Sequence, residues 1–205
     1  MAEAATMTEK PAYLGLLNAI SLGESEAGVL LEAWANATPD EDLAKVLRFV
    51  ALREKQHGDA FCRRLLELGY PLRQKVDPDA VGRLAKYANP KIHDCEKLPA
   101  ESGDDSAVVD TFRDIETSVK AGKFDPMTAN MLTWYIAEER DSGRRLKQAY
   151  DCVREKAGVQ GNGRASSMAA MNSGPSADAQ AIMACMTEGF ARLEKSMEKL
   201  AKALK

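Results

Sequence analysis

Glu54-Lys55-Gln56-His57 lies at the centre of a stretch whose apolar residues recur at steps of three and four. This spacing keeps them on one side of an α-helix and predicts a long amphipathic helix. The stripe reads Leu43, Val46, Val50, Glu54, His57, Phe61, Leu65 and Leu68. Glu54 and His57 therefore fall on the apolar face. A buried charge there needs a hydrogen bond, an ion pair or a metal ion, because an unpartnered buried carboxylate is very costly.

The preceding helix, expected over about residues 11–37, carries another acid on its apolar stripe. That stripe reads Tyr13, Leu17, Ile20, Glu24, Ala27, Leu31 and Trp34. The next helix is predicted to open directly afterwards, with Thr38 as N-cap, Pro39 at the first helical position and Glu41 completing a capping box. Almost no loop separates the two helices, so they must form an antiparallel hairpin.

Within this hairpin the two acids are expected at about the same height. Glu24 lies fourteen residues before Thr38, Glu54 lies sixteen after it, and each helical residue rises about 1.5 Å. His57 follows one turn beyond. Two carboxylates and an imidazole that converge in an apolar interior predict a site suited to iron or manganese. Glu-x-x-His pointing inward is also a half-site of di-iron carboxylate bundles.

The rest of the chain also reads as helix, without a convincing strand pattern, so we predict an all-α fold. A proline-rich connection covers residues 70–104 and contains one short helix near 77–87. A third helix is expected over about 105–121, and a fourth over about 126–156 after an Asp-Pro cap. Two hairpins joined by a long crossover between the second and third helices predict a ferritin-like four-helix bundle.

Three segments are expected along the chain. Residues 1–157 form the bundle, residues 158–177 a flexible Gly/Ser/Ala/Met-rich linker, and residues 178–205 a C-terminal amphipathic helix. The stripe of this last helix reads Ile182, Met186, Phe190, Leu193, Met197, Leu200 and Leu204. Three interpretations stay open: the helix packs on the bundle, pairs with a second copy to make a homo-oligomer, or binds a partner groove.

Composition excludes several classes of function. The net charge of −3 argues against a nucleic-acid-binding surface. The N-terminus lacks the pattern of a secretory signal, and no uninterrupted apolar stretch approaches the length of a membrane span. The four cysteines form no Cys-x-x-Cys pair, which excludes a rubredoxin-type or zinc-finger site and indicates reduced thiols. We therefore expect a cytoplasmic protein without nucleic-acid or membrane partners.

Two stretches resemble a known family. Asn18–Ala27, followed about thirty residues later by Glu54–His57, resembles the first hairpin of the rubrerythrin branch of the ferritin-like superfamily. That family carries Gly-Glu-Ser-x-Ala on its first helix and Glu-x-x-His on its second. Ile136–Asp141 resembles the fourth-helix segment, which normally reads Ala-Glu-Glu-x-His. The resemblance covers about residues 11–156.

The resemblance implies a metal site and an activity. Its ligands would be Glu24, Glu54, His57 and Glu138, with Asp141 in place of the fourth-helix histidine. The site would hold two iron ions, or manganese, and act in peroxide or dioxygen redox chemistry or in iron handling. A di-iron oxidoreductase of this kind would need an external electron donor, because the four-cysteine rubredoxin module is missing here.

Other assignments stay open. The third-helix ligand is either Asp105, on the apolar stripe, or Glu116, at its edge. The fourth helix has one stripe that reads Met131, Trp134, Glu138 and Asp141 and another that reads Leu132, Ile136, Glu139, Gly143 and Leu146. Arg145, one turn past Asp141, could pair with a carboxylate in place of metal. The alternative function is a metal-free helical scaffold or interaction module.

Overall fold

The structure is a computed structural model that describes residues 10–74, 77–98 and 112–158. Over these residues the chain forms α-helices and no strand, which confirms the all-α prediction. The helices are α1 (Leu14–Ala37), α2 (Glu41–Glu67), α3 (Ala80–Ala88), α4 (Asp94–Lys97), α5 (Arg113–Lys120) and α6 (Pro126–Lys156). The predicted C-terminal helix and all of the predicted linker after Gly158 lie outside the described residues.

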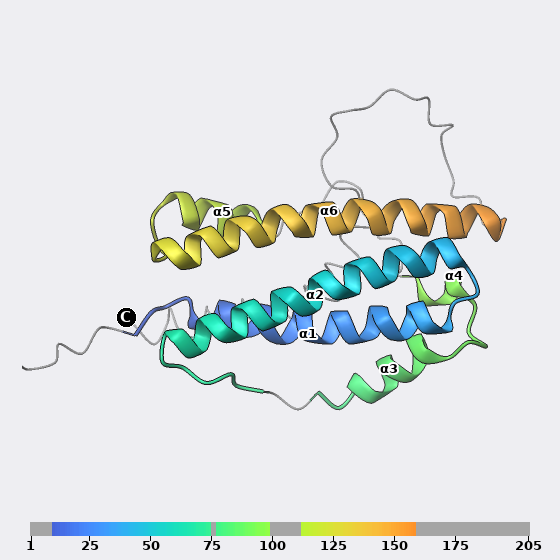
Figure 1. Cartoon of the computed structure of the whole chain (residues 1–205), viewed down its shortest axis with the longest axis horizontal. Helices are drawn as coiled ribbons and strands as arrows, with labels where there is room; N and C mark the ends of the chain where they lie inside the picture. The colour runs from blue at the N-terminus through green and yellow to red at the C-terminus, as the bar shows by residue number, and fades with distance from the viewer. Residues whose placement is uncertain (1–9, 75–76, 99–111, 159–205) are drawn as a thin grey trace, which may run out of the picture.

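Helices α1 and α2 form the antiparallel hairpin expected from the sequence (Figure 1). The N-cap of α2 is Asp40, whose side chain accepts hydrogen bonds from the backbone N–H groups of Asp42 and Leu43. The assignment of Thr38 to this position was wrong. The Thr38 hydroxyl instead accepts a hydrogen bond from Asp40 N and donates one to Asp94 of α4, because the chain turns two residues later than expected.

Helix α6 runs antiparallel to α2 and packs along it, on the side of α2 away from α3 (Figure 1). It starts and ends where the sequence predicted, and Asp125 caps it by accepting from the N–H groups of Met127 and Thr128. Gly122, with φ of +67°, makes the turn from α5 into α6. Of the predicted third helix, only the part that forms α5 falls within the described residues.

The described parts of the connection between α2 and α5 contain two short helices, α3 and α4. Helix α3 lies against α1, and its Arg83 forms ion pairs with Glu26 of α1 and with Asp77. Helix α4 was not predicted; its buried Asp94 accepts hydrogen bonds from Trp34 at the end of α1 and from Thr38. These contacts fasten the connection to the first hairpin.

The core consists of two apolar clusters, one towards each end of the long helices. The first cluster contains Leu14, Leu17, Ile20, Phe61, Leu65, Phe112, Leu132, Tyr135 and Ile136. The second contains Leu31, Trp34, Ala35, Leu43, Leu47, Val50, Ala51, Leu146, Tyr150 and Val153. In α1, α2 and α6 alike, the residues between the two clusters include buried acids, so a polar layer crosses the middle of the core.

Within the described residues, α1 is the one helix long and apolar enough to cross a membrane by length and composition. A buried core helix passes the same test, and α1 packs Leu17, Ile20 and Trp34 inside the molecule.

Candidate metal centre

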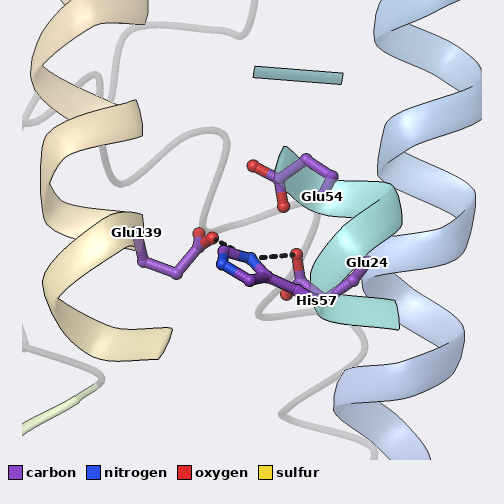
Figure 2. Close-up of side chains that lie close together, drawn as sticks. All are labelled: Glu24, Glu54, His57 and Glu139. Atoms are coloured by element: carbon purple, nitrogen blue, oxygen red, sulfur yellow. Dashed lines mark ion pairs between the residues drawn. The ribbon is translucent and has the colours of Figure 1, made fainter. Parts of the chain in front are cut away.

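Four buried side chains meet in the polar layer: Glu24 from α1, Glu54 and His57 from α2, and Glu139 from α6 (Figure 2). One ligand atom from each lies within 4.8 Å of the others. The structure thus brings together three of the residues selected from the sequence, at the matching height that the hairpin geometry predicted. The fourth member, Glu139, lies on the alternative stripe of the last helix.

Close packing of α1 on α2 sets this height. The Ser21 hydroxyl donates a hydrogen bond of 2.8 Å to the carbonyl oxygen of Gly58, one turn from Glu24 and next to His57. A Cβ atom on Gly58 would lie 3.0 Å from the backbone nitrogen of Ser25, so only glycine permits this approach. The short inter-helix distance aligns Glu24 with the Glu54/His57 turn.

The atoms that face one another in the cluster have no hydrogen-bond partner. These atoms are Glu24 Oε2, Glu54 Oε2, His57 Nδ1 and Glu139 Oε1. His57 Nδ1 lies 3.1 Å from Glu139 Oε1 and 3.8 Å from Glu24 Oε2 without hydrogen-bond geometry to either. Buried polar atoms are normally satisfied, so these four neighbouring atoms form a cluster that could hold a metal ion.

Two of these groups, Glu24 and His57, have a hydrogen-bond partner on their other polar atom. The Tyr135 hydroxyl donates a hydrogen bond of 2.7 Å to Glu24 Oε1. His57 Nε2 lies 2.9 Å from Glu138 Oε2. Hydrogen bonds on the outer atoms of metal ligands fix the direction of the inner ones. Glu24 and His57 thus each have one polar atom held from outside the cluster and another inside it that lacks a hydrogen-bond partner.

Burial and the neighbouring charges together raise the pKa values of three residues in the cluster. Burial, assisted by the charge of Glu139, raises the pKa of Glu24 to about 8. Burial and the charge of Glu24 raise the pKa of Glu54 well above its ordinary value. Burial lowers the pKa of His57, but Glu139, Glu138 and Glu54 raise it by more, so the net shift is upward. Without metal, the cluster retains protons that a bound cation would displace.

The donor set fits a single hard metal ion. Three carboxylates and one imidazole suit iron or manganese. Ligand atoms of one such ion lie at most about 4.4 Å apart, twice a metal–ligand bond of roughly 2.2 Å, which is close to the observed span. Two ions would have to share these same four side chains, because the cluster contains no other ligand from the described residues.

Helix α6 uses the stripe that contains Leu132, Ile136, Glu139 and Leu146. Glu138 consequently points partly to solvent, with 31% of its side chain exposed, and touches the outer nitrogen of His57. Asp141 is similarly exposed and pairs with Arg53 at 3.0 Å and Arg145 at 2.7 Å. The structure therefore does not bring Asp141 into the cluster, and Arg145 pairs with it as the sequence analysis considered.

The remaining candidate ligands lie elsewhere. Glu116 of α5 forms two hydrogen bonds with Arg140, and Asp105 lies outside the described residues. The other histidine of the chain, His93, is exposed and caps α4, where it accepts a hydrogen bond from the N–H of Cys95. The resemblance singled out Glu138 and not Glu139; the second apolar stripe of the last helix was the signal that pointed to Glu139.

Comparison with known proteins found no matching protein family, no matching curated protein and no matching solved structure.

Proposed function

We propose that this chain is a ferritin-like protein that binds one divalent ion of iron or manganese through Glu24, Glu54, His57 and Glu139. The observation that carries this proposal is the convergence of four buried ligand atoms without hydrogen-bond partners. Three carboxylates could not share such a volume unless protons or a cation reduced their repulsion.

The arrangement of helices supports the ferritin-like assignment. Two hairpins, α1–α2 and α5–α6, are joined by a long connection, and the ligands come from the interior faces of three helices. The second Glu-x-x-His half-site of a two-metal centre has no counterpart in the described residues. Arginines instead bind Asp141 and Glu116, which favours one ion over the two that the sequence resemblance implied.

The proposed activity is redox chemistry on peroxide or dioxygen, with electrons from an external donor. Bound iron or manganese would supply the change in oxidation state. The protein would hold the ion in a water-excluded core and keep the Tyr135 hydroxyl next to the ligand Glu24. The Trp134 ring, 38% exposed, lies edge-on to His57 with centroids 4.8 Å apart and connects the site to the surface.

Metal analysis of the purified full chain tests the proposal. After expression with iron or manganese, we expect a single ion per chain, and E139Q and H57A should abolish it. The matched control is E116Q, which removes a carboxylate that pairs with Arg140 outside the cluster and should leave the metal content unchanged. Two ions per chain would favour the two-metal site that the sequence resemblance implied. Equal metal content in wild type and H57A would show that His57 does not belong to a metal site.

A metal-free scaffold is the second candidate. It is favoured by the arginines that bind Asp141 and Glu116 and by the raised pKa values of Glu24 and Glu54, which allow a neutral, proton-sharing cluster. Wild-type protein without metal after metal-replete expression would select this candidate. A cytoplasmic location and self-association through residues 178–205 stay predictions from the sequence.

A further inference from the structure

We infer that Glu138 is a positioning residue, which holds the His57 ring so that Nδ1 faces the cluster. This inference rests on the proposed metal site and assigns Glu138 a different role from the ligand that the sequence resemblance implied. It also explains why Glu138 and Glu139, adjacent in sequence, both contact the same imidazole from different sides.

The contact with Glu138 determines which nitrogen carries the proton. Glu138 Oε2 lies 2.9 Å from His57 Nε2, whereas Nδ1 is the ring nitrogen that lies near Glu139 and Glu24. An ionised carboxylate only accepts hydrogen bonds, so Nε2 must donate. In the neutral ring the lone pair then resides on Nδ1, the atom that faces Glu24 and Glu139 and has no hydrogen-bond partner.

The ring has little freedom to turn away from this orientation. His57 is fully buried, and the rings of Trp134 and Tyr135 contact it edge-on with centroid distances of 4.8 and 5.1 Å. Rotation that placed Nε2 towards the cluster would cost the hydrogen bond to Glu138.

Glu138 is itself held in place by Arg53 of α2. Arg53 Nη1 donates a hydrogen bond of 3.1 Å to the Glu138 carbonyl oxygen, and its Nε lies 3.8 Å from Glu138 Oε2. The same Nη1 donates to Asp141 Oδ2 and to Ser142 Oγ. Asp141 thus helps to hold Arg53, and Arg53 in turn contacts Glu138. Both of the fourth-helix residues predicted as ligands therefore lie next to the four-residue cluster and not in it.

The ligand and positioning roles predict different results for Glu138 variants. A glutamine at this position can still accept from Nε2 through its amide oxygen, whereas leucine cannot. We expect E138Q to bind Mn²⁺ with nearly wild-type affinity and E138L to bind about 10–100-fold more weakly. E139Q, which alters an inner ligand, should lose binding altogether. Titration calorimetry with Mn²⁺ measures the affinities, and thermal melts confirm that each variant is folded.

A spectroscopic readout tests the inference independently of metal. The chain has only two histidines, so ¹⁵N-histidine labelling of the full chain gives few signals, and an H93Q variant assigns them. In metal-free protein, at a pH high enough to deprotonate the ring, His57 should carry its proton on Nε2 in wild type and E138Q. In E138L the proton should move, in part or wholly, to Nδ1.

The two experiments separate failure of this inference from failure of the proposed function. If wild type binds no Mn²⁺, the proposed function fails. The position of the proton on the His57 ring, measured by NMR, still tests the role of Glu138. An unchanged tautomer in E138L would overturn the inference. Loss of binding in E138Q as complete as in E139Q would also overturn it, because Glu138 would then act as a ligand.

Discussion

The Tyr135 hydroxyl of α6 donates a hydrogen bond of 2.7 Å to Oε1 of Glu24 in α1, although 111 residues separate them. The bond occupies one carboxylate oxygen, while the other, Oε2, has no hydrogen-bond partner and lies 3.8 Å from His57 Nδ1 in the cluster. Tyr135 also belongs to the first apolar cluster, where its ring packs against Phe61. Packing of α6 therefore orients a carboxylate that α1 contributes to the cluster.

Replacing Tyr135 with phenylalanine should weaken both stability and metal binding. Y135F leaves a buried carboxylate oxygen without its donor, which should cost about 1–3 kcal/mol in metal-free protein. Loss of the outer hydrogen bond should weaken Mn²⁺ binding about 10–100-fold. Denaturant unfolding and titration calorimetry measure the two effects. The control Y13F removes a hydrogen bond to Asp125 far from the cluster and should leave Mn²⁺ affinity unchanged.

Stability of the metal-free protein should fall as pH rises from about 4.5 to about 8. The pKa of Glu24 is about 8 in the folded protein and 4.5 as its ordinary value, so over this range the folded state binds more protons than the unfolded state. The raised pKa of His57 acts in the same direction above its ordinary value. Each proton contributes a slope of at most about 1.4 kcal/mol per pH unit.

Urea unfolding in chelator between pH 5 and 8.5 measures this dependence. E24Q, which cannot ionise, should make the profile shallower, while the raised pKa values of Glu54 and His57 supply the slope that is left. Bound Mn²⁺ should stabilise the protein more as pH rises because metal binding releases protons. A wild-type profile as flat as that of E24Q would contradict the raised pKa.

Two glycines in the first hairpin should respond to alanine in opposite ways. In G58A the new Cβ would lie 3.0 and 3.1 Å from backbone atoms of Ser25 and Ser21, so α1 and α2 must separate. We expect a loss of about 1–3 kcal/mol together with weaker Mn²⁺ binding. In G23A the Cβ meets nothing within 4 Å, and helix propensity should stabilise α1 by up to about 1 kcal/mol. Equal stability of the two variants would refute the close approach at Gly58.

Asp125 should stabilise the fold at neutral pH and lose this effect in acid. Burial alone would raise its pKa, but hydrogen bonds from Thr128, Tyr13 and Arg64 lower it by more. Because the folded pKa lies below the unfolded value of about 3.9, the contribution is complete above that pH and disappears as pH falls towards the folded pKa.

D125A should therefore unfold about 1–3 kcal/mol more easily at pH 7, and its difference from wild type should shrink below about pH 4. Denaturant titrations at a series of pH values measure this difference. The control D42A removes an exposed acid that pairs with Lys45 and should change stability by less than about 0.5 kcal/mol. If D125A remained as strongly destabilised relative to wild type in strong acid, the loss of stability would come from the missing side-chain atoms and not from the missing charge.

Local signals in the sequence predicted much of the helical structure. Asp125-Pro126 marked the start of α6 correctly because an N-cap and the proline after it act within one helical turn. The register of Glu24, Glu54 and His57 was also predictable, since a hairpin with almost no loop leaves little freedom in relative height. The resemblance to rubrerythrins, in contrast, stays a prediction.

These local signals could not predict how α6 is rotated about its own axis. Its two candidate stripes differ by one residue, about 100° around the helix axis, and each contains an acid. Packing of Tyr135 and Ile136 into the first apolar cluster selects the stripe with Glu139 and turns Glu138 to the outside of His57. Arginine pairing likewise depends on which side chains from other helices come within reach, as Arg53 does for Asp141.

The sequence by itself thus determined the all-α class and the three first-hairpin residues of the cluster, because capping, periodicity and hairpin length are local properties of the chain. The tertiary structure decided the fourth member. Only the packing of α6 against both α1 and α2 establishes that Glu139 enters the polar layer while Glu138 and Asp141 stay in the surrounding hydrogen-bond network.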